Sequence, residues 1–179
     1  MIIADLPLPG LKLIEIEKRG DERGFFARTY CADEFAAAGL PTNFVQQNLS
    51  YSSERYTLRG IHFQVAPFEE AKLARCTRGA IWDLALDMRE DCPTFGRWHG
   101  VELTADNRLS LFVPAGFGHA FLSLRDDSEA IYMSSADYRA DAERVVRWND
   151  PLFAIDWPIE PVHLSDKDRN RPDFIRRGS

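Results

Sequence analysis

The sequence has few cysteines, and their spacing suits neither a disulfide framework nor a metal site. Cys31, Cys76 and Cys92 are scattered over 179 residues, and no two of them form a Cys-x-x-Cys pair. An odd number of scattered cysteines is typical of free thiols in a reducing compartment. We therefore expect three free thiols and a cytoplasmic protein.

Long apolar runs and an excess of basic charge are also missing. No apolar stretch approaches the ~20 residues that a membrane-spanning helix needs, so we expect no membrane association. Proline, glycine and charged residues interrupt segment 1–24, which is unlike a secretory signal peptide. The net charge is −6, whereas a nucleic-acid binder needs a basic surface, so we expect no nucleic-acid partner. A small anionic ligand stays compatible, because a few arginines in one cleft dominate locally.

Short runs in which apolar and polar residues alternate are frequent along the chain. The run 80–88 (AIWDLALDM) places its tryptophan, leucines and methionine on one face, and an isoleucine, an alanine and two aspartates on the other. Similar short runs lie at 11–16, 109–113 and 130–134, with turn residues between them. A period of two at this spacing predicts an all-β protein with an antiparallel sandwich or barrel.

Helical signals are sparse. Asp33 is the expected N-cap of one short helix, which Gly39 and Pro41 bring to an end. Residues 151–179, rich in Pro, Asp and Arg, are expected to wrap the barrel as irregular structure with a helical turn. No repeat or linker divides the chain, so we predict a single domain over residues 1–179.

The histidines are the first candidates for chemistry, and their spacing argues against a metal. A barrel enzyme of the metal-binding cupin type needs a His-x-His pair, a Glu and a later His, because its ligands must converge at about 2 Å. The sequence has no His-x-His pair, and Gln64 stands two residues after His62. We therefore expect no metal site.

Acid/base chemistry without a metal is the other use for these residues. It requires a base, an acid on the opposite face of the substrate, and a cation beside the developing negative charge. His62, within LRGIHFQ, is a suitable base near neutral pH, and Lys72 is a candidate cation. Tyr132 lies in a predicted strand that can point it inward. Spacing alone leaves open whether this tyrosine is a catalyst or a core residue.

Ten segments of the chain, taken together and in order, carry a more specific signal. They are DERGFF (21–26), FVQQNLS (44–50), LRGIHFQ (58–64), AKLARCTRGAIWDLALDMR (71–89), PTFGRW (93–98), VPAGFGHAF (113–121), IYMSSADY (131–138), RWNDP (147–151), IDWP (155–158) and LSDKD (164–168). In these segments the chain resembles the dTDP-4-dehydrorhamnose 3,5-epimerase family over nearly its whole length. The resemblance implies an antiparallel, cupin-like jelly-roll barrel with a few short peripheral helices. It also implies a homodimer that exchanges N-terminal strands, a nucleotide-sugar substrate of deoxysugar and lipopolysaccharide biosynthesis, and no cofactor.

The resemblance further implies roles for individual residues. The base corresponds to His62, oriented by Asp168, and the acid corresponds to Tyr132. Lys72 would stabilise the enolate that forms when a proton next to the C4 ketone is removed from C3 or C5. The substrate-binding positions correspond to Arg23, Arg28, Gln46, Asn48, Arg59, His119, Tyr138, Glu143 and Lys167. Judged by its polar surroundings alone, Asp168 is a solvated acid.

One position departs from the family pattern D-x-R-G-x-F-x-E. Arg28 stands where the family has a glutamate that accepts a hydrogen bond from the nucleotide base. An arginine only donates, which suits the acceptor edge of cytosine or guanine. The alternative prediction is therefore a C3-only or C5-only epimerase that acts on a CDP- or GDP-linked 4-keto sugar.

Two other classes of protein fit the residues less well. A metal-dependent cupin oxygenase would need the missing His-x-His pair. A non-catalytic sugar-binding jelly roll gives no reason for His62, Tyr132, Lys72 and Asp168 to occur together.

Overall fold

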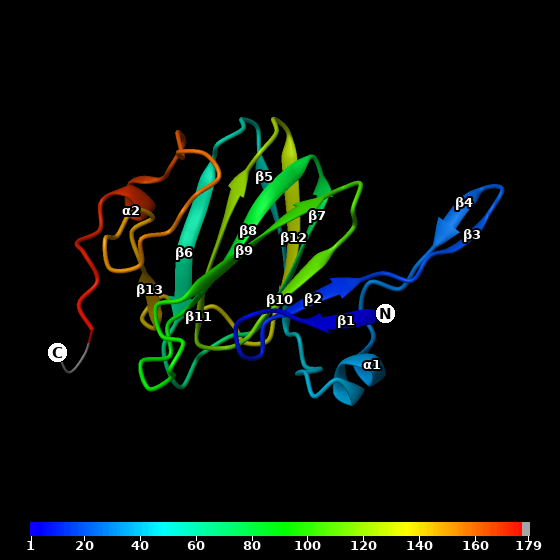
Figure 1. The fold of residues 1–179 in the computed structure, drawn as a ribbon, viewed down its shortest axis with the longest axis horizontal. Coiled ribbons are helices and arrows are strands. Elements are labelled where there is room, and N and C mark those ends of the chain that lie inside the picture. The colour runs from blue at the N-terminus through cyan, green and yellow to red at the C-terminus, as the bar shows by residue number, and fades with distance from the viewer. Residues whose placement is uncertain (177–179) are drawn as a thin grey trace.

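Two antiparallel β-sheets face each other in the computed structural model, which describes residues 1–176 (Figure 1). One sheet has six strands in the order β1-β2-β10-β7-β12-β5, and the other has five in the order β13-β6-β11-β8-β9. Every strand pairing within them is antiparallel. The prediction of an all-β antiparallel fold is confirmed.

The elements have the following bounds. The strands are β1 (Ile2–Asp5), β2 (Lys12–Glu15), β3 (Arg19–Asp21), β4 (Gly24–Phe26), β5 (Gln46–Ser52), β6 (Leu58–Gln64), β7 (Lys72–Arg78), β8 (Ala80–Asp87), β9 (Trp98–Thr104), β10 (Ser110–Val113), β11 (Phe117–Ser123), β12 (Ser128–Ser134) and β13 (Glu143–Val145). The helices are α1 (Ala32–Ala37) and α2 (Asp166–Arg169).

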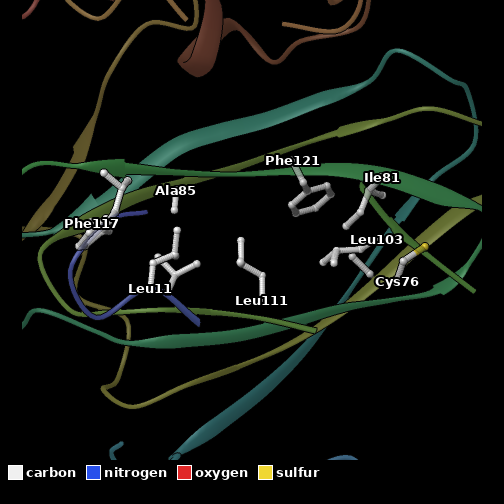
Figure 2. Packing of buried hydrophobic residues seen from close by; sticks show 11 residues of the cluster. Leu11, Cys76, Ile81, Ala85, Leu103, Leu111, Phe117 and Phe121 are labelled. Carbon is white, nitrogen blue, oxygen red and sulfur yellow. The ribbon is translucent and has the colours of Figure 1, made fainter. Parts of the chain in front are cut away.

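The central core lies between the two sheets. Figure 2 shows apolar side chains from both sheets meeting there, with Leu111 on one side and Phe121 on the other. The two faces of the run 80–88 are the predicted ones, because Ile81 and Ala85 of β8 point into this core. The opposite face of β8 packs against the C-terminal segment, so this strand is buried on both faces.

The C-terminal segment, of which residues 151–176 are described, covers the outer face of the five-stranded sheet (Figure 1). The buried carboxylate of Asp150 accepts hydrogen bonds from the backbone N–H groups of Leu152 at 2.9 Å and Phe174 at 2.5 Å. These two bonds hold both ends of the segment together. Its described part is irregular apart from α2 and a bridge between Thr57 and His163, and residues 177–179 lie outside the described residues.

Helix α1 covers the outer face of the six-stranded sheet through its buried Phe35. The prediction that Asp33 caps it is wrong. The N-cap is Cys31, whose side chain makes no capping hydrogen bond, and Asp33 lies in the first turn. Packing of Phe35 fixes where this short helix begins, since tertiary contacts outweigh local capping preferences in so short a helix.

Strands β3 and β4 form a hairpin that projects away from the two sheets (Figure 1). Its apolar residues Phe25 and Phe26 are exposed, and the side chain of Arg23 is 84% exposed. The cationic groups of Lys18 and Arg108 lie over the Phe25 ring, but both rings stay exposed, so the hairpin buries little apolar surface against its own chain.

Two further predictions concern the whole chain. All three cysteines are free, as predicted. Within residues 1–176, no helix is long and apolar enough to cross a membrane.

Candidate active site

Two cavities, of about 530 and 360 Å³, open between the sheets and meet at three shared residues. The shared residues are His62 of β6, Lys72 of β7 and Tyr132 of β12. His62 belongs to the five-stranded sheet, whereas Tyr132 belongs to the six-stranded sheet. A ligand at this junction would therefore have the imidazole and the phenol on different sides.

His62 is paired with a carboxylate from the far end of the chain. Its Nε2 lies 2.6 Å from Oδ1 of Asp168, the residue that polar surroundings had indicated to be solvated. Asp168 is only 4% exposed, because α2 turns it inward and Ser165 caps the helix at the Asp168 N–H. Burial acts to raise the pKa of Asp168, but the hydrogen bond and charge of His62 outweigh it, so this pKa is lowered.

The protein also places a histidine–aspartate pair beside this junction. His119 of β11 lies directly across from His62 in the sheet, and its Nε2 is 2.6 Å from Oδ1 of Asp83. Both members of the pair are buried. The other oxygen of Asp83 is buried as well, and within residues 1–176 it has no hydrogen-bond partner.

Lys72 and Tyr132 lie on neighbouring strands of the six-stranded sheet. Nζ of Lys72 is 3.0 Å from the Glu70 carboxylate, and both side chains are largely buried. Burial raises the pKa of the Tyr132 phenol, and the negative charge of Glu70 raises it further, against the opposing charge of Arg59. Tyr132 therefore keeps its proton at neutral pH, as a proton donor must.

Glu143 connects several of the predicted substrate-binding residues. Its carboxylate accepts hydrogen bonds from Lys167 at 2.5 Å and from the Tyr138 hydroxyl at 3.0 Å, and it lies 3.8 Å from Nδ1 of His62. Burial acts to raise the pKa of Glu143, but the hydrogen bonds from Lys167 and Tyr138 and the charge of His62 lower it overall. Lys167 thus reaches the site through Glu143.

Strand β5 supplies a polar row along the cavities. Gln46 and Asn48 line the smaller cavity and Ser50 the larger one, as expected for residues two apart on one face of a strand. Asn48 is directly across from Tyr132. Arg59, on β6, lines the larger cavity and donates a hydrogen bond to the backbone oxygen of Tyr51 at 2.8 Å.

Three of the predicted substrate-binding residues line neither cavity: Arg23, Arg28 and Lys167, the last of which reaches the site only through Glu143. Arg23 lies on the projecting hairpin and pairs with Asp21 at 2.5 Å. Arg28 follows the hairpin and pairs with Glu34 of α1 at 2.9 Å. The hairpin points away from the chain's own cavities (Figure 1), so a substrate-binding role for Arg23 and Arg28 stays a prediction.

Sequence reasoning missed three ionisable residues at or behind the site. Asp83 could have been found, because a carboxylate in an otherwise apolar run needs a buried partner. Glu70 precedes Lys72 by two residues, which gives only a weak signal. Arg169 lines the larger cavity from α2, and nothing in its polar segment distinguished it. Within the described part of the chain, no group of three or more His, Cys, Asp or Glu side chains could hold a metal ion.

The fold and the site together define a class of protein. A histidine on one sheet, held by an aspartate of α2, and a protonated tyrosine on the other sheet, with a lysine on the strand beside it, can move a proton from one face of a small ligand to the other. An antiparallel barrel with this arrangement is an acid/base isomerase of the epimerase type.

Comparisons with known proteins specify the family. The family model described as dTDP-4-dehydrorhamnose 3,5-epimerase matches residues 5–175. A protein of that name from Sinorhizobium fredii (strain NBRC 101917 / NGR234) is 40% identical over 175 residues, which is 97% of this chain and 90% of the relative. The dTDP-4-dehydrorhamnose 3,5-epimerase of Bacillus anthracis str. Ames, solved with TDP and PPi bound, superimposes with a TM-score of 0.92. Its identity is 41%, covering 97% of this chain and 99% of the other.

A second similar structure, from Legionella pneumophila Philadelphia 1, contains dTDP-4-keto-L-rhamnose; its TM-score is 0.87 at 37% identity, covering 93% and 89% of the two chains. The chain belongs to the dTDP-4-dehydrorhamnose 3,5-epimerase family, and the predicted jelly-roll fold and isomerase class are confirmed. The names of these relatives support the dTDP-linked prediction over the CDP- or GDP-linked alternative.

Replacing Asp168 by Asn tests the His62 pair. The amide no longer balances a positive charge on His62, and its N–H can force the wrong tautomer, so we expect kcat to fall by about 10²- to 10⁴-fold. Epimerisation rates and dTDP binding should be measured together, with binding expected to stay unchanged. Asp166→Asn, an exposed position in the same helix, is the matched control. Equal kcat values for the two variants would show that the pair has no role in turnover.

Proposed function

We propose that this protein epimerises dTDP-4-dehydro-6-deoxyglucose at C3 and C5. The observation that carries the proposal is the junction of the two cavities, where His62 and Tyr132 come from opposite sheets and Lys72, on the strand next to Tyr132, lines both cavities. The proposed roles follow from the chemistry of a 4-keto sugar, in which the protons on C3 and C5 are both acidified by the C4 carbonyl.

His62 is the proposed base. Its Nε2–H is donated to the Asp168 carboxylate, so Nδ1 is the ring nitrogen with a free lone pair for the substrate proton. When the imidazole takes the proton it becomes a cation, and the buried carboxylate stabilises that cation. Asp168 therefore acts on both the tautomer and the charge of the base.

Lys72 is the proposed stabiliser of the enolate. Removal of a proton from C3 or C5 leaves negative charge on the C4 oxygen, and an ammonium placed at that oxygen lowers the barrier. One such preorganised contact is typically worth about 3 kcal/mol of transition-state stabilisation. His119, held by Asp83, lines the same cavity and is proposed to bind the sugar ring.

Tyr132 is the proposed acid. It gives its proton to the carbon from the face opposite His62, which inverts the centre. Burial and the Glu70 charge raise its pKa, so the phenol is neutral when the enolate forms. Each inversion leaves a protonated His62 and a tyrosinate, and the protons must return through solvent before the second centre reacts.

The nucleotide is proposed to lie along the polar row of β5. Arg59 offers the charge that a diphosphate requires, and the amides of Gln46 and Asn48 offer hydrogen bonds. Tyr138 lines the smaller cavity and is 57% exposed as a residue, which suits stacking of its ring on a base. The hydroxyl of this tyrosine donates to Glu143, which also accepts from Lys167.

A homodimer is proposed to complete the site. The projecting hairpin carries Arg23 and two exposed aromatic rings away from its own sheets, which suits delivery to a second copy. The edge strand β5 also turns apolar residues outward, with Leu49 60% exposed. In this arrangement Arg23 would approach the diphosphate in the partner's site. The role of Arg28 near the base stays a prediction, as do the cytoplasmic location and the single domain.

Turnover of three nucleotide sugars tests the proposal. We expect the protein to epimerise dTDP-4-dehydro-6-deoxyglucose and to leave the CDP- and GDP-linked analogues unchanged, as followed by NMR of the sugar protons. His62→Ala should lose at least about 10³-fold in kcat, because the base is removed. His99→Ala, on β9 and outside both cavities, is the control. Faster turnover of a CDP- or GDP-linked sugar would overturn the choice of nucleotide.

Mixing two variants with different substitutions tests whether the two subunits share a site. Arg23→Ala and His62→Ala homodimers should each be impaired, whereas mixed dimers contain one site that has both native residues. Random reassortment gives roughly a quarter of the sites intact, so we expect about a quarter of the wild-type activity. Activity is measured after the dimers have exchanged subunits, which mass spectrometry of isotope-labelled chains can follow. No recovery in confirmed mixed dimers would mean that both residues act in one chain's own site.

A further inference from the structure

Glu70 forms an ion pair with Lys72 at the edge of the junction. The two side chains are 13% and 11% exposed, and Oε1 of Glu70 lies 3.0 Å from Nζ of Lys72. Glu70 lines the smaller cavity, and Lys72 lines both cavities. A lysine side chain is long and flexible, so a fixed, largely buried partner restricts the positions that its ammonium can take.

The backbone between these residues is fastened to the end of the strand that carries Tyr132. The N–H of Ala71 donates to Oγ of Ser135 at 2.8 Å, and the N–H of Ser135 donates to the oxygen of Ala71 at 3.0 Å. Lys72 is also opposite Ser134 in the register of β7 and β12. Glu70, Lys72 and Tyr132 are therefore held by one rigid part of the sheet.

The charges that face Tyr132 come from several elements. The ionisable residues lining the two cavities around it are Glu70 and Lys72, Arg59 and His62 of β6, His119 of β11, Tyr138, Glu143 of β13, and His163, Asp168 and Arg169 of the C-terminal segment. Several of these carboxylates are committed elsewhere: Asp168 to His62, and Glu143 to Lys167 and Tyr138. After burial, Glu70 is the group that most raises the pKa of Tyr132, and Arg59 opposes it.

We propose that Glu70 is a positioning residue of the reaction, which holds the Lys72 ammonium at the junction and supplies the negative charge that favours Tyr132 as a neutral proton donor. The inference rests on the proposed function, because it assigns Glu70 to the acid and to the enolate stabiliser of that reaction. Glu70 has no direct contact with the reacting carbons in this account; it acts through Lys72 and Tyr132.

The first test titrates Tyr132 without any substrate. Ultraviolet difference spectra of tyrosinate, taken as each protein minus its own Tyr132→Phe variant, isolate this phenol from the other tyrosines. In Glu70→Gln, the loss of the negative charge should move the titration of Tyr132 to lower pH by about half a unit or more. Glu69→Gln makes the same chemical change at the exposed neighbouring residue and should leave the titration unchanged. An equal midpoint in Glu70→Gln and the wild type would overturn this half of the proposal.

The second test separates kcat from KM at neutral pH. Glu70→Gln keeps an oxygen that can accept from Lys72, so its kcat should fall by less than about threefold, whereas Glu70→Ala frees the ammonium and should lose about tenfold or more. KM should change little in either variant, because the proposed role is in the reaction and not in binding. Wild-type kcat in Glu70→Ala, or a loss confined to KM, would contradict the positioning role.

The two tests distinguish failure of this inference from failure of the proposed function. An inactive wild type would reject the function, while the titration of Tyr132 would still report whether Glu70 acts on it. An active wild type with unaltered Glu70 variants would reject the inference alone. Thermal melting identifies a variant that does not fold. Either Glu70→Ala or Glu70→Gln can be used in the titration, because both remove the negative charge.

Discussion

The hydrogen bond between His62 and Asp168 joins two positions that are 106 residues apart in the chain. It forms only if α2 is docked against β6, and α2 is docked only if the C-terminal segment covers the outer face of the five-stranded sheet. That covering depends in turn on apolar packing and on the buried carboxylate of Asp150, which receives backbone N–H groups from both ends of the segment. The geometry of the base is thus fixed by the packing of a segment that has almost no regular structure.

Other buried polar groups of the site also depend on a partner that holds them in place. An ionised side chain loses its hydration on burial, so it needs a partner at hydrogen-bond distance. His119 has Asp83, and Lys72 has Glu70. Each pair holds the imidazole of His119 or the ammonium of Lys72 in one position, and both residues still line a cavity. We infer that the low exposure of the site serves the chemistry, because a lysine near an enolate is worth more where water is scarce.

Much of the fold could be predicted from the sequence, because alternation reports directly on strands. Alternation in the run 80–88 predicted correctly which residues share a face, and each face of β8 packs against an apolar layer. The start of α1 was wrong because Phe35 packs against the sheet and sets the helix position, which no capping signal could reveal. The ten segments that resemble the family contain the residues that meet at the junction, although the roles of these residues stay predictions.

Other features of the site depend on three-dimensional placement that sequence patterns do not contain. Asp168 lies among polar residues, and only the docking of α2 shows that it is buried. Arg23 matched a substrate-binding motif, yet the hairpin carries it away from the cavities of its own chain. Glu70 is one of two adjacent acids, and its neighbour Glu69 is exposed. Which of two adjacent acids turns inward depends on how the backbone attaches to β12.

The central claim is that His62 and Tyr132 act on opposite faces of the sugar, and deuterium uptake tests it most directly. The wild type, His62→Ala and Tyr132→Phe would each be incubated with dTDP-4-dehydro-6-deoxyglucose in heavy water, and the sugar followed by mass spectrometry and NMR. The wild type should introduce deuterium at C3 and C5 with inversion, and His62→Ala should introduce almost none. Tyr132→Phe should introduce deuterium with much less inversion, since His62 then returns a proton to the face from which it came. Undiminished exchange in His62→Ala, or undiminished inversion in Tyr132→Phe, would contradict the account.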